Sequence, residues 1–426
     1  MIIKKTLFLL TFIISSLSLS SQVKIRLNIQ NLNDSTFYLL KYKSDKTHFA
    51  IDSCSFSDNY TFRNDNKYEE GIYVIADSRQ NPLFEILIDK DQKFSVNIKE
   101  PMDFKTYKVK GCKTTSEYFK IYYESVHYNL YIKALESEIK YNPSNKDKID
   151  SLTKELHKYQ ESKLQRNNSF LNTYIKFVEK VVIPEELKDN EKAAKQYVIE
   201  HYFDELPLCD TRILNSRLLK NKLDEYFNNI IAEESVDLTC KMIDKLLTKT
   251  NDCHDVRDYI LWNLYSRYFN PNDLKHENTF IYLVDNYFSK LEIINLTDNI
   301  RNEIVKKANI LKKITIGSVM PDLSFVDKNG DITSLRDIDS RNTIVIFHKT
   351  DCNICHRTSR ILSLIEKRNK DLKIIDINVT DEKSSQDIIR RYDITNVPTI
   401  YVLDKDKRII TKGIKAEEVE FYLKRK

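Results

Sequence analysis

Glycine is nearly missing from this sequence. Only five glycines occur in 426 residues, and none lies between Gly111 and Gly317, whereas average usage is about 7%. Tight β-turns rely on glycine where the backbone φ is positive. The long glycine-free stretch is therefore expected to be helical.

A marked excess of charge is missing too. The sequence has 68 basic and 63 acidic side chains, a net formal charge of +5, which is too small for a nucleic-acid-binding protein. Short basic clusters such as 424–426 are interpreted as solvated surface. The length and the 41% hydrophobic content predict a soluble globular protein of two or three domains.

The N-terminus has the pattern of a secretory signal. Lys4 and Lys5 form a basic start, residues 7–14 form an apolar core, and residues 18–20 supply small side chains for cleavage. A retained anchor helix is the alternative, but the apolar core is shorter than the roughly 20 residues of a membrane span. We therefore expect residues 1–20 to be removed. The mature protein is then predicted to be exported, without a stable membrane span, to the periplasm of a Gram-negative cell envelope.

Short alternating segments indicate an antiparallel β-domain at residues 21–112. Residues 23–29 alternate strictly between apolar and polar side chains, which is typical of a half-buried strand. The other predicted strands are 36–40, 71–75, 84–88 and 94–98. Their spacing favours a sandwich-like domain, and no acid, base or metal-ligand constellation accompanies it. Binding or docking is expected here.

A helical period replaces this alternation in residues 113–313. Prolines fall between the predicted helices, where helices end. The first two helices begin near residues 116 and 149, and further helices are predicted at 191–203, 212–232, 235–249, 254–269, 277–290 and 298–312. The all-α region is interpreted as a spacer or platform.

Five cysteines lie outside the motif described below: Cys54, Cys112, Cys209, Cys240 and Cys253. Some could pair in an oxidising compartment, but their spacing matches no known disulfide framework. Neither does a second ligand pair at zinc spacing accompany them. They are interpreted as buried small side chains.

The chemistry is expected at Cys352-Asn353-Ile354-Cys355, directly after an apolar strand at 343–348. Two cysteines at this spacing at a helix start can close a short disulfide ring, and the helix dipole favours a thiolate on Cys352. With His356 the motif also reads C-x-x-C-H, which is how haem c is attached. Both chemistries are open at this point.

The flanking sequence follows an alternating β and α order. Its opening is Gly317-x-x-x-Pro321-Asp322, and Val397-Pro398-Thr399 starts 42 residues beyond Cys355. A helix from 352 to about 367, with Ile361, Leu364 and Ile365 turned inward, a strand at 372–378 and a last helix at about 416–424 are predicted.

This order resembles the thioredoxin-like fold, and specifically the exported disulfide reductases of the TlpA/ResA-like family, over residues 314–426. The whole layout also looks like exported proteins common in Bacteroidetes. The resemblance implies that Cys352 is the attacking thiolate, Cys355 the resolving thiol, and Cys352–Cys355 the redox disulfide. It further implies that Pro398 is a cis-proline and that the backbone of Val397 pairs with an extended substrate.

Three positions depart from the family pattern. Asp351 replaces the usual aromatic residue before the first cysteine, Ile354 replaces a frequent proline, and Ile346 replaces the buried acid of thioredoxins. Asp351 opposes thiolate formation, while His356 favours it. We therefore expect both residues to modulate the cysteine couple.

The leading hypothesis is an α/β thioredoxin-like thiol–disulfide oxidoreductase that acts as a reductase. Its partners would be protein thiols and disulfides and an upstream redox protein, with no metal or cofactor. One alternative is a binding or scaffold protein whose thioredoxin-like domain only docks. A third class, a haem c electron carrier, explains neither the preceding strand nor the Val397-Pro398-Thr399 segment.

Overall fold

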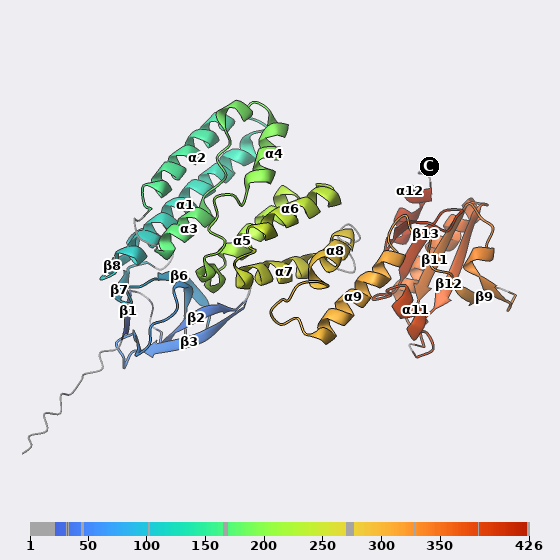
Figure 1. Cartoon of the computed structure of the whole chain (residues 1–426), viewed down its shortest axis with the longest axis horizontal. Coiled ribbons are helices and arrows are strands. Elements are labelled where there is room, and N and C mark those ends of the chain that lie inside the picture. The colour runs from blue at the N-terminus through green and yellow to red at the C-terminus, as the bar shows by residue number, and fades with distance from the viewer. Residues whose placement is uncertain are drawn as a thin grey trace, which may run out of the picture. The chain divides into compact units, whose positions relative to one another are not determined.

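A computed structural model describes residues 22–423, except 31, 33, 44–46, 101–102, 165–168, 270–276, 328 and 382. The predicted signal segment, residues 1–20, lies outside the described residues. The chain divides into two compact units, Met1–Ala232 and Glu233–Lys426 (Figure 1).

The N-terminal unit contains two four-stranded sheets, drawn in blue to teal in Figure 1, with the orders β4-β1-β7-β8 and β3-β2-β5-β6. The strands are β1 (Val23–Ile29), β2 (Thr36–Lys43), β3 (Thr47–Ser55), β4 (Thr61–Asn64), β5 (Gly71–Ala76), β6 (Pro82–Ile88), β7 (Lys93–Ile98) and β8 (Lys108–Lys110). In β1, the odd-numbered Val23, Ile25 and Leu27 are buried and the intervening Lys24 and Arg26 are exposed. The predicted alternation is therefore confirmed.

One pairing departs from the antiparallel expectation. Among the described strands of this unit, β1 pairs with β7 in parallel, and the remaining pairs are antiparallel. Parallel neighbours need a long crossover connection, and here the strands β2 to β6 form that connection. Local alternation carries no signal for such a pairing.

Helices follow the strands in the same unit. They are α1 (Lys113–Glu138), α2 (Asn145–Glu161), α3 (Phe170–Val178), α4 (Glu191–His201) and α5 (Leu218–Glu225), with 3-10 turns η1 (Phe104–Thr106), η2 (Glu185–Leu187) and η3 (Thr211–Asn215) and a π segment η4 (Tyr226–Ile230). No glycine or proline interrupts α1, so it stays continuous for 26 residues. Side-chain caps fix two of the helix starts: Ser169 accepts from the Leu171 N–H and Asn190 from the Ala193 N–H.

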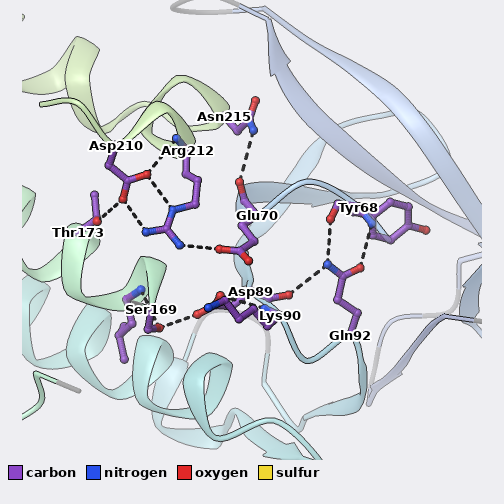
Figure 2. A network of polar contacts seen from close by, with 11 residues as sticks. Tyr68, Glu70, Asp89, Lys90, Gln92, Ser169, Thr173, Asp210, Arg212 and Asn215 are labelled. Atoms are coloured by element: carbon purple, nitrogen blue, oxygen red, sulfur yellow. Dashed lines mark hydrogen bonds and ion pairs between the residues drawn. The ribbon is translucent and has the colours of Figure 1, made fainter. Parts of the chain in front are cut away.

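A polar network centred on Arg212 joins η3 to the strands and to α3 (Figure 2). The Arg212 guanidinium donates to Asp210 through Nε and Nη2, at 2.8 and 2.7 Å, and to Glu70 Oε2 through Nη1 at 2.5 Å. Thr173 of α3 donates to the same Asp210 carboxylate. Burial alone raises the pKa of Asp210, but the hydrogen bonds from Arg212 and Thr173 outweigh burial and lower it.

The close approach of η3 to the start of β5 explains why residue 71 is a glycine. A Cβ at Gly71, next to Glu70, would lie 2.7 Å from Asn215 Cβ and 3.0 Å from the Asn215 carbonyl oxygen. Asn215 Nδ2 donates in turn to the Glu70 carbonyl at 3.3 Å. The start of β5 and η3 thus approach each other too closely for any larger residue.

We expect Arg212→Gln to lower the free energy of unfolding by about 2–3 kcal/mol, because it leaves the half-buried carboxylates of Asp210 and Glu70 without their cation. Urea denaturation measures this loss, with the exposed Arg79→Gln as the matched control. The pKa of Asp210 is lowered on folding, so its stabilising contribution is present above the ordinary pKa of 3.8 and is lost as the pH falls through the lowered value. Equal stability of the two variants at pH 7 would contradict the assigned role.

The C-terminal unit begins with helices and continues as an α/β domain. The helices are α6 (Val236–Thr248), α7 (His254–Tyr268), α8 (Glu277–Leu283) with the π segment η6 (Val284–Phe288), and α9 (Asp298–Lys313). A hairpin of β9 (Ser324–Val326) and β10 (Ile332–Ser334) follows. The main sheet has the order β12-β11-β13-β14, with β11 (Asn342–His348), β12 (Leu372–Asn378), β13 (Thr399–Leu403) and β14 (Ile409–Lys412) (Figure 1).

Strand β11 is buried on both faces. Ile344 and Ile346 belong to a core cluster with Leu362 of α10 (Asn353–Arg368) and Val419 of α12 (Val419–Leu423). On the other face, the Phe347 ring lies 5.4 Å from that of Tyr392 and 6.0 Å from that of Tyr401. Tyr392 follows α11 (Gln386–Arg391), and its hydroxyl donates to the carbonyls of Pro321 and Asp322, which anchors the opening motif.

An ion pair ties α8 to the sheet inside this unit. Lys412 of β14 and Glu277 of α8 lie 2.5 Å apart, with side chains only 6% and 9% exposed. Burial raises the pKa of Glu277 and lowers that of Lys412, while each partner opposes the effect on the other. A buried pair of this kind orients its two elements rather than adding much net stability.

The predicted architecture is confirmed: a strand-rich N-terminal region, a helical middle and a C-terminal α/β domain. The sequence analysis missed β3, β4, β8 and α3, which are short or lack a clean period. Leu364 was expected to face inward but is 54% exposed, and Leu362 is buried at 1% in its place. The buried stripe of α10 runs through Cys355, Thr358, Leu362 and Ile365, and Leu364 lies off this stripe.

Candidate functional site

The motif Cys352–Cys355 lies where β11 ends and α10 begins. Residues 343–347 are buried, and the chain leaves the sheet through a short exposed turn that contains Asp351. Cys352 has an extended backbone, with φ −124° and ψ 102°, and is the N-cap of α10. The end of the buried strand β11 therefore places Cys352 at the N-terminus of α10.

The two cysteines form a disulfide, with their Cα atoms 5.2 Å apart. Cys355 is 1% exposed, whereas Cys352 is half-buried. The backbone N–H of Cys355 donates to Cys352 Sγ at 3.1 Å. In the reduced form this N–H and the helix dipole would stabilise a thiolate on Cys352, the sulfur that solvent can reach.

The peptide bond between Val397 and Pro398 is cis, so this expectation is confirmed. Phe347 of β11 pairs with Thr399 of β13 in antiparallel register. Pro398 therefore meets the end of β11 at the same sheet edge at which Cys352 follows it. Both Val397 and Pro398 are half-buried.

The position of the missing buried acid is filled by Ile346, which is 0% exposed. Asp376 of β12 pairs with Ile346 in register, and its carboxylate forms an ion pair with His348. His348 lies two residues after Ile346 and so on the same face of the sheet. The sequence analysis missed this pair, since only the parallel register of β11 and β12 brings it together.

Asp351 and His356, the expected modulating residues, both have exposed side chains. They flank the disulfide in sequence, one before Cys352 and one after Cys355. Ile354 is 69% exposed, so it presents an apolar side chain between the two cysteines. The effect of Asp351 and His356 on the couple stays a prediction.

A groove of about 380 Å³ lies beside the cis-proline segment. Its lining consists of Lys349, Val379, Lys383, Gln386, Ile389, Ile394, Thr395, Asn396 and Val397. None of these described lining residues is acidic. Of these lining residues, only Val397 was expected to contact a substrate. The lining comes from three separate segments of the chain, at 349, 379–389 and 394–397, and sequence spacing does not show that they meet.

The cysteines outside the motif differ in state. Cys54, Cys112 and Cys240 are buried free thiols, as expected. Burial raises the pKa of Cys54 to about 12 and that of Cys240 to about 11, which makes both unreactive at neutral pH. Cys209 and Cys253 are disulfide-bonded, a state that the sequence had left open, and Cys209 is exposed rather than buried as expected.

The described residues contain no group of three or more His, Cys, Asp or Glu side chains that could hold a metal ion. Nor does any described helix have the length and apolar character to cross a bilayer.

Comparison with protein families gives two matches. Residues 344–407 match the glutaredoxin family, and this span includes most of β11, the cysteine pair and the cis-proline. The C-terminal region is a thioredoxin-like domain. Residues 151–309 match a domain of unknown function, DUF5106, which covers most of the helical middle. No curated protein matches the chain.

Several solved structures are similar to parts of the chain. A thioredoxin-like protein from Bacteroides caccae is 19% identical with a TM-score of 0.47, over 57% of this chain and 96% of that protein. A domain of a possible thiol-disulfide isomerase from Cytophaga hutchinsonii is 26% identical with a TM-score of 0.23, over 25% and 90%. The thioredoxin domain of a thiol-disulfide oxidoreductase from Bacteroides vulgatus is 21% identical with a TM-score of 0.23, over 25% and 96%.

We expect iodoacetamide to alkylate Cys352 of the reduced, folded protein at least about tenfold faster than Cys355, because Cys352 is only half-buried and lies at the helix N-terminus, whereas Cys355 is buried. Peptide mapping by mass spectrometry after short labelling times measures the two rates. The buried Cys54 and Cys240 serve as internal controls that stay unlabelled until the protein is denatured. Equal labelling of Cys352 and Cys355 would contradict the assigned asymmetry.

Proposed function

We propose that this chain is an exported thiol–disulfide oxidoreductase that reduces disulfides of protein substrates through Cys352 and Cys355. The observation that carries the proposal is the asymmetric cysteine pair at the start of α10, with one reachable sulfur and one buried at 1% exposure. The match of residues 344–407 to the glutaredoxin family supports the same reaction class. A TlpA-like role in the periplasm is the form of this activity that we propose.

The reaction proceeds in two exchange steps. The Cys352 thiolate attacks one sulfur of a client disulfide, which forms a Cys352–client bond and releases the other client sulfur as a thiolate that takes up a proton. Cys355 then loses its proton and attacks Cys352 Sγ, which forms the Cys352–Cys355 disulfide and releases the second client thiol. The client gains two electrons, and an upstream dithiol protein must return two electrons to this domain.

Asp351 favours the reductase direction. A carboxylate beside Cys352 disfavours the thiolate, and a less stable dithiol form makes the couple more reducing. The N-cap position and His356 act in the opposite sense by stabilising the thiolate. The proposed direction rests on Asp351.

The alternative functions have less support. Thioether bonds to a haem require both sulfurs to reach a porphyrin edge, whereas Cys355 is 1% exposed. A pure docking domain has no use for the paired cysteines at the N-terminus of α10. Export is proposed from the sequence of residues 1–20 alone, because these residues lie outside the described part of the chain.

Replacing the cysteines one at a time separates their roles. We expect Cys352→Ser to abolish reduction of a protein disulfide such as that of insulin, and Cys355→Ser to accumulate mixed disulfides, since the second step is then missing. Turbidity of reduced insulin and non-reducing gels measure the two effects. Cys240→Ala, a buried thiol outside the motif, is the control with unchanged activity. Trapping by neither variant would refute exchange through this pair.

The reduction potential decides the direction. We expect a value near or below about −250 mV for the Cys352–Cys355 couple, and we expect Asp351→Asn to raise it, because the neutral side chain no longer disfavours the thiolate. Equilibration with glutathione or dithiothreitol buffers, followed by thiol alkylation, measures both values. A potential near about −120 mV would instead indicate an oxidant.

A further inference from the structure

We propose that Thr350, Asn378 and Thr380 form a hydrogen-bonded clamp that positions Cys352 at the N-terminus of α10 for thiol–disulfide exchange. These three residues are called the turn clamp below. The inference rests on the proposed function and adds positioning residues to its site.

The turn before Cys352 lies outside the sheet. Strand β11 ends at His348 and Cys352 is the N-cap of α10, so residues 349–351 alone join the two elements. Thr350 and Asp351 are exposed. Core packing therefore fixes the end of β11, and hydrogen bonds must pass this fixed position on to the turn.

The neighbouring strand β12 leaves the sheet at the same end. His348 pairs with Asn378 in the parallel ladder, and the backbone N–H of Val379 donates to the His348 carbonyl at 2.8 Å. The ion pair between His348 and Asp376 joins the same two strand ends. Val379 is 0% exposed, so the exit of β12 is anchored in the core beside the turn.

The turn clamp ties Thr350 to this exit through three hydrogen bonds. The Thr350 N–H donates to Thr380 Oγ1 at 2.7 Å, and the two threonine hydroxyls share a hydrogen bond of 2.9 Å. Asn378 Nδ2 donates to Thr350 Oγ1 at 3.0 Å, while Asn378 Oδ1 accepts from the Thr380 N–H at 2.8 Å. Side chains at the exit of β12 thus hold the residue two positions before Cys352 by both its backbone and its side chain.

The geometry that follows this turn stabilises the reactive thiolate. Cys352 has the extended backbone of an N-cap, with φ −124° and ψ 102°, and its Sγ accepts from the Cys355 N–H at 3.1 Å. The effect of a helix N-terminus on a charge falls off within the first turn, so a turn that is free to move weakens it. Without the clamp, the reduced protein holds less Cys352 thiolate at neutral pH and exchanges more slowly.

Removal of the two hydroxyls tests the clamp. Thr350→Val combined with Thr380→Val keeps both side chains β-branched but removes their hydroxyl groups, whereas Thr350→Ser combined with Thr380→Ser keeps the hydroxyl groups. Thr333→Val in strand β10 is the control outside the clamp. The full chains are reduced, and the rate of alkylation of Cys352 by iodoacetamide is measured across the pH range in which the thiol titrates.

We expect the valine variant to shift the midpoint of this pH profile to higher pH and to react about threefold more slowly below the midpoint, because its thiolate is less stabilised. The plateau above the midpoint, where the thiol is fully ionised, should stay within about twofold of the unmodified protein. The serine variant and Thr333→Val should keep the original midpoint. A merely structural role of the clamp would lower the stability of the fold without moving the midpoint.

Two results would overturn the inference. One is a valine variant with the same midpoint as the unmodified protein, and the other is an equal shift in the valine variant and in the Thr333→Val control. Either result leaves the proposed function intact where the unmodified protein reduces the disulfides of insulin. Failure of the unmodified protein to reduce them would overturn the proposed function itself, and the inference with it.

Discussion

Burial of β11 on both faces is the constraint on which the redox site depends. Ile344 and Ile346 pack beneath α10 and α12, and Phe347 packs against two tyrosine rings. A strand held in this way cannot slip by one residue without exposing one set of side chains and burying another. Its end therefore has a fixed place in the domain. Cys352 follows four residues after that end, so the sheet core determines where Cys352 lies.

Ile346 is an apolar residue where thioredoxins carry a buried acid. It adds to the core cluster beneath α10 and supplies no ionisable group there. The ionisable groups on this face lie at its margin instead, where His348 and Asp376 form their ion pair. Asp376 belongs to the edge strand β12, so it stays half-exposed, and its ionised form keeps its hydration.

Sequence patterns predicted features that depend on neighbours along the chain. The alternation in β1, the glycine-free helices and the cysteine spacing are all local, and so is the Val397-Pro398 step. The features that were missed depend on residues far apart in sequence. Arg212 meets Glu70 across 142 positions, and His348 meets Asp376 only through strand register. Leu364 faces solvent because it lies off the stripe of α10 that packs on the sheet. The groove beside Val397 likewise takes its two lysines from separate segments.

Two kinds of polar contact support the chain for different reasons. The Arg212 network joins strands to helices in the N-terminal unit through a bidentate guanidinium, which demands one geometry. The Lys412–Glu277 pair orients α8 against β14 beside the thioredoxin-like sheet. Neither contact includes Cys352 or Cys355, so each holds its own elements in place without taking part in the cysteine couple. Asp351 and Ile354 are exposed next to the cysteine pair, and the proposed direction of exchange rests on Asp351. Substitutions there should change activity with little effect on stability, whereas substitutions of Arg212 or Lys412 should do the reverse.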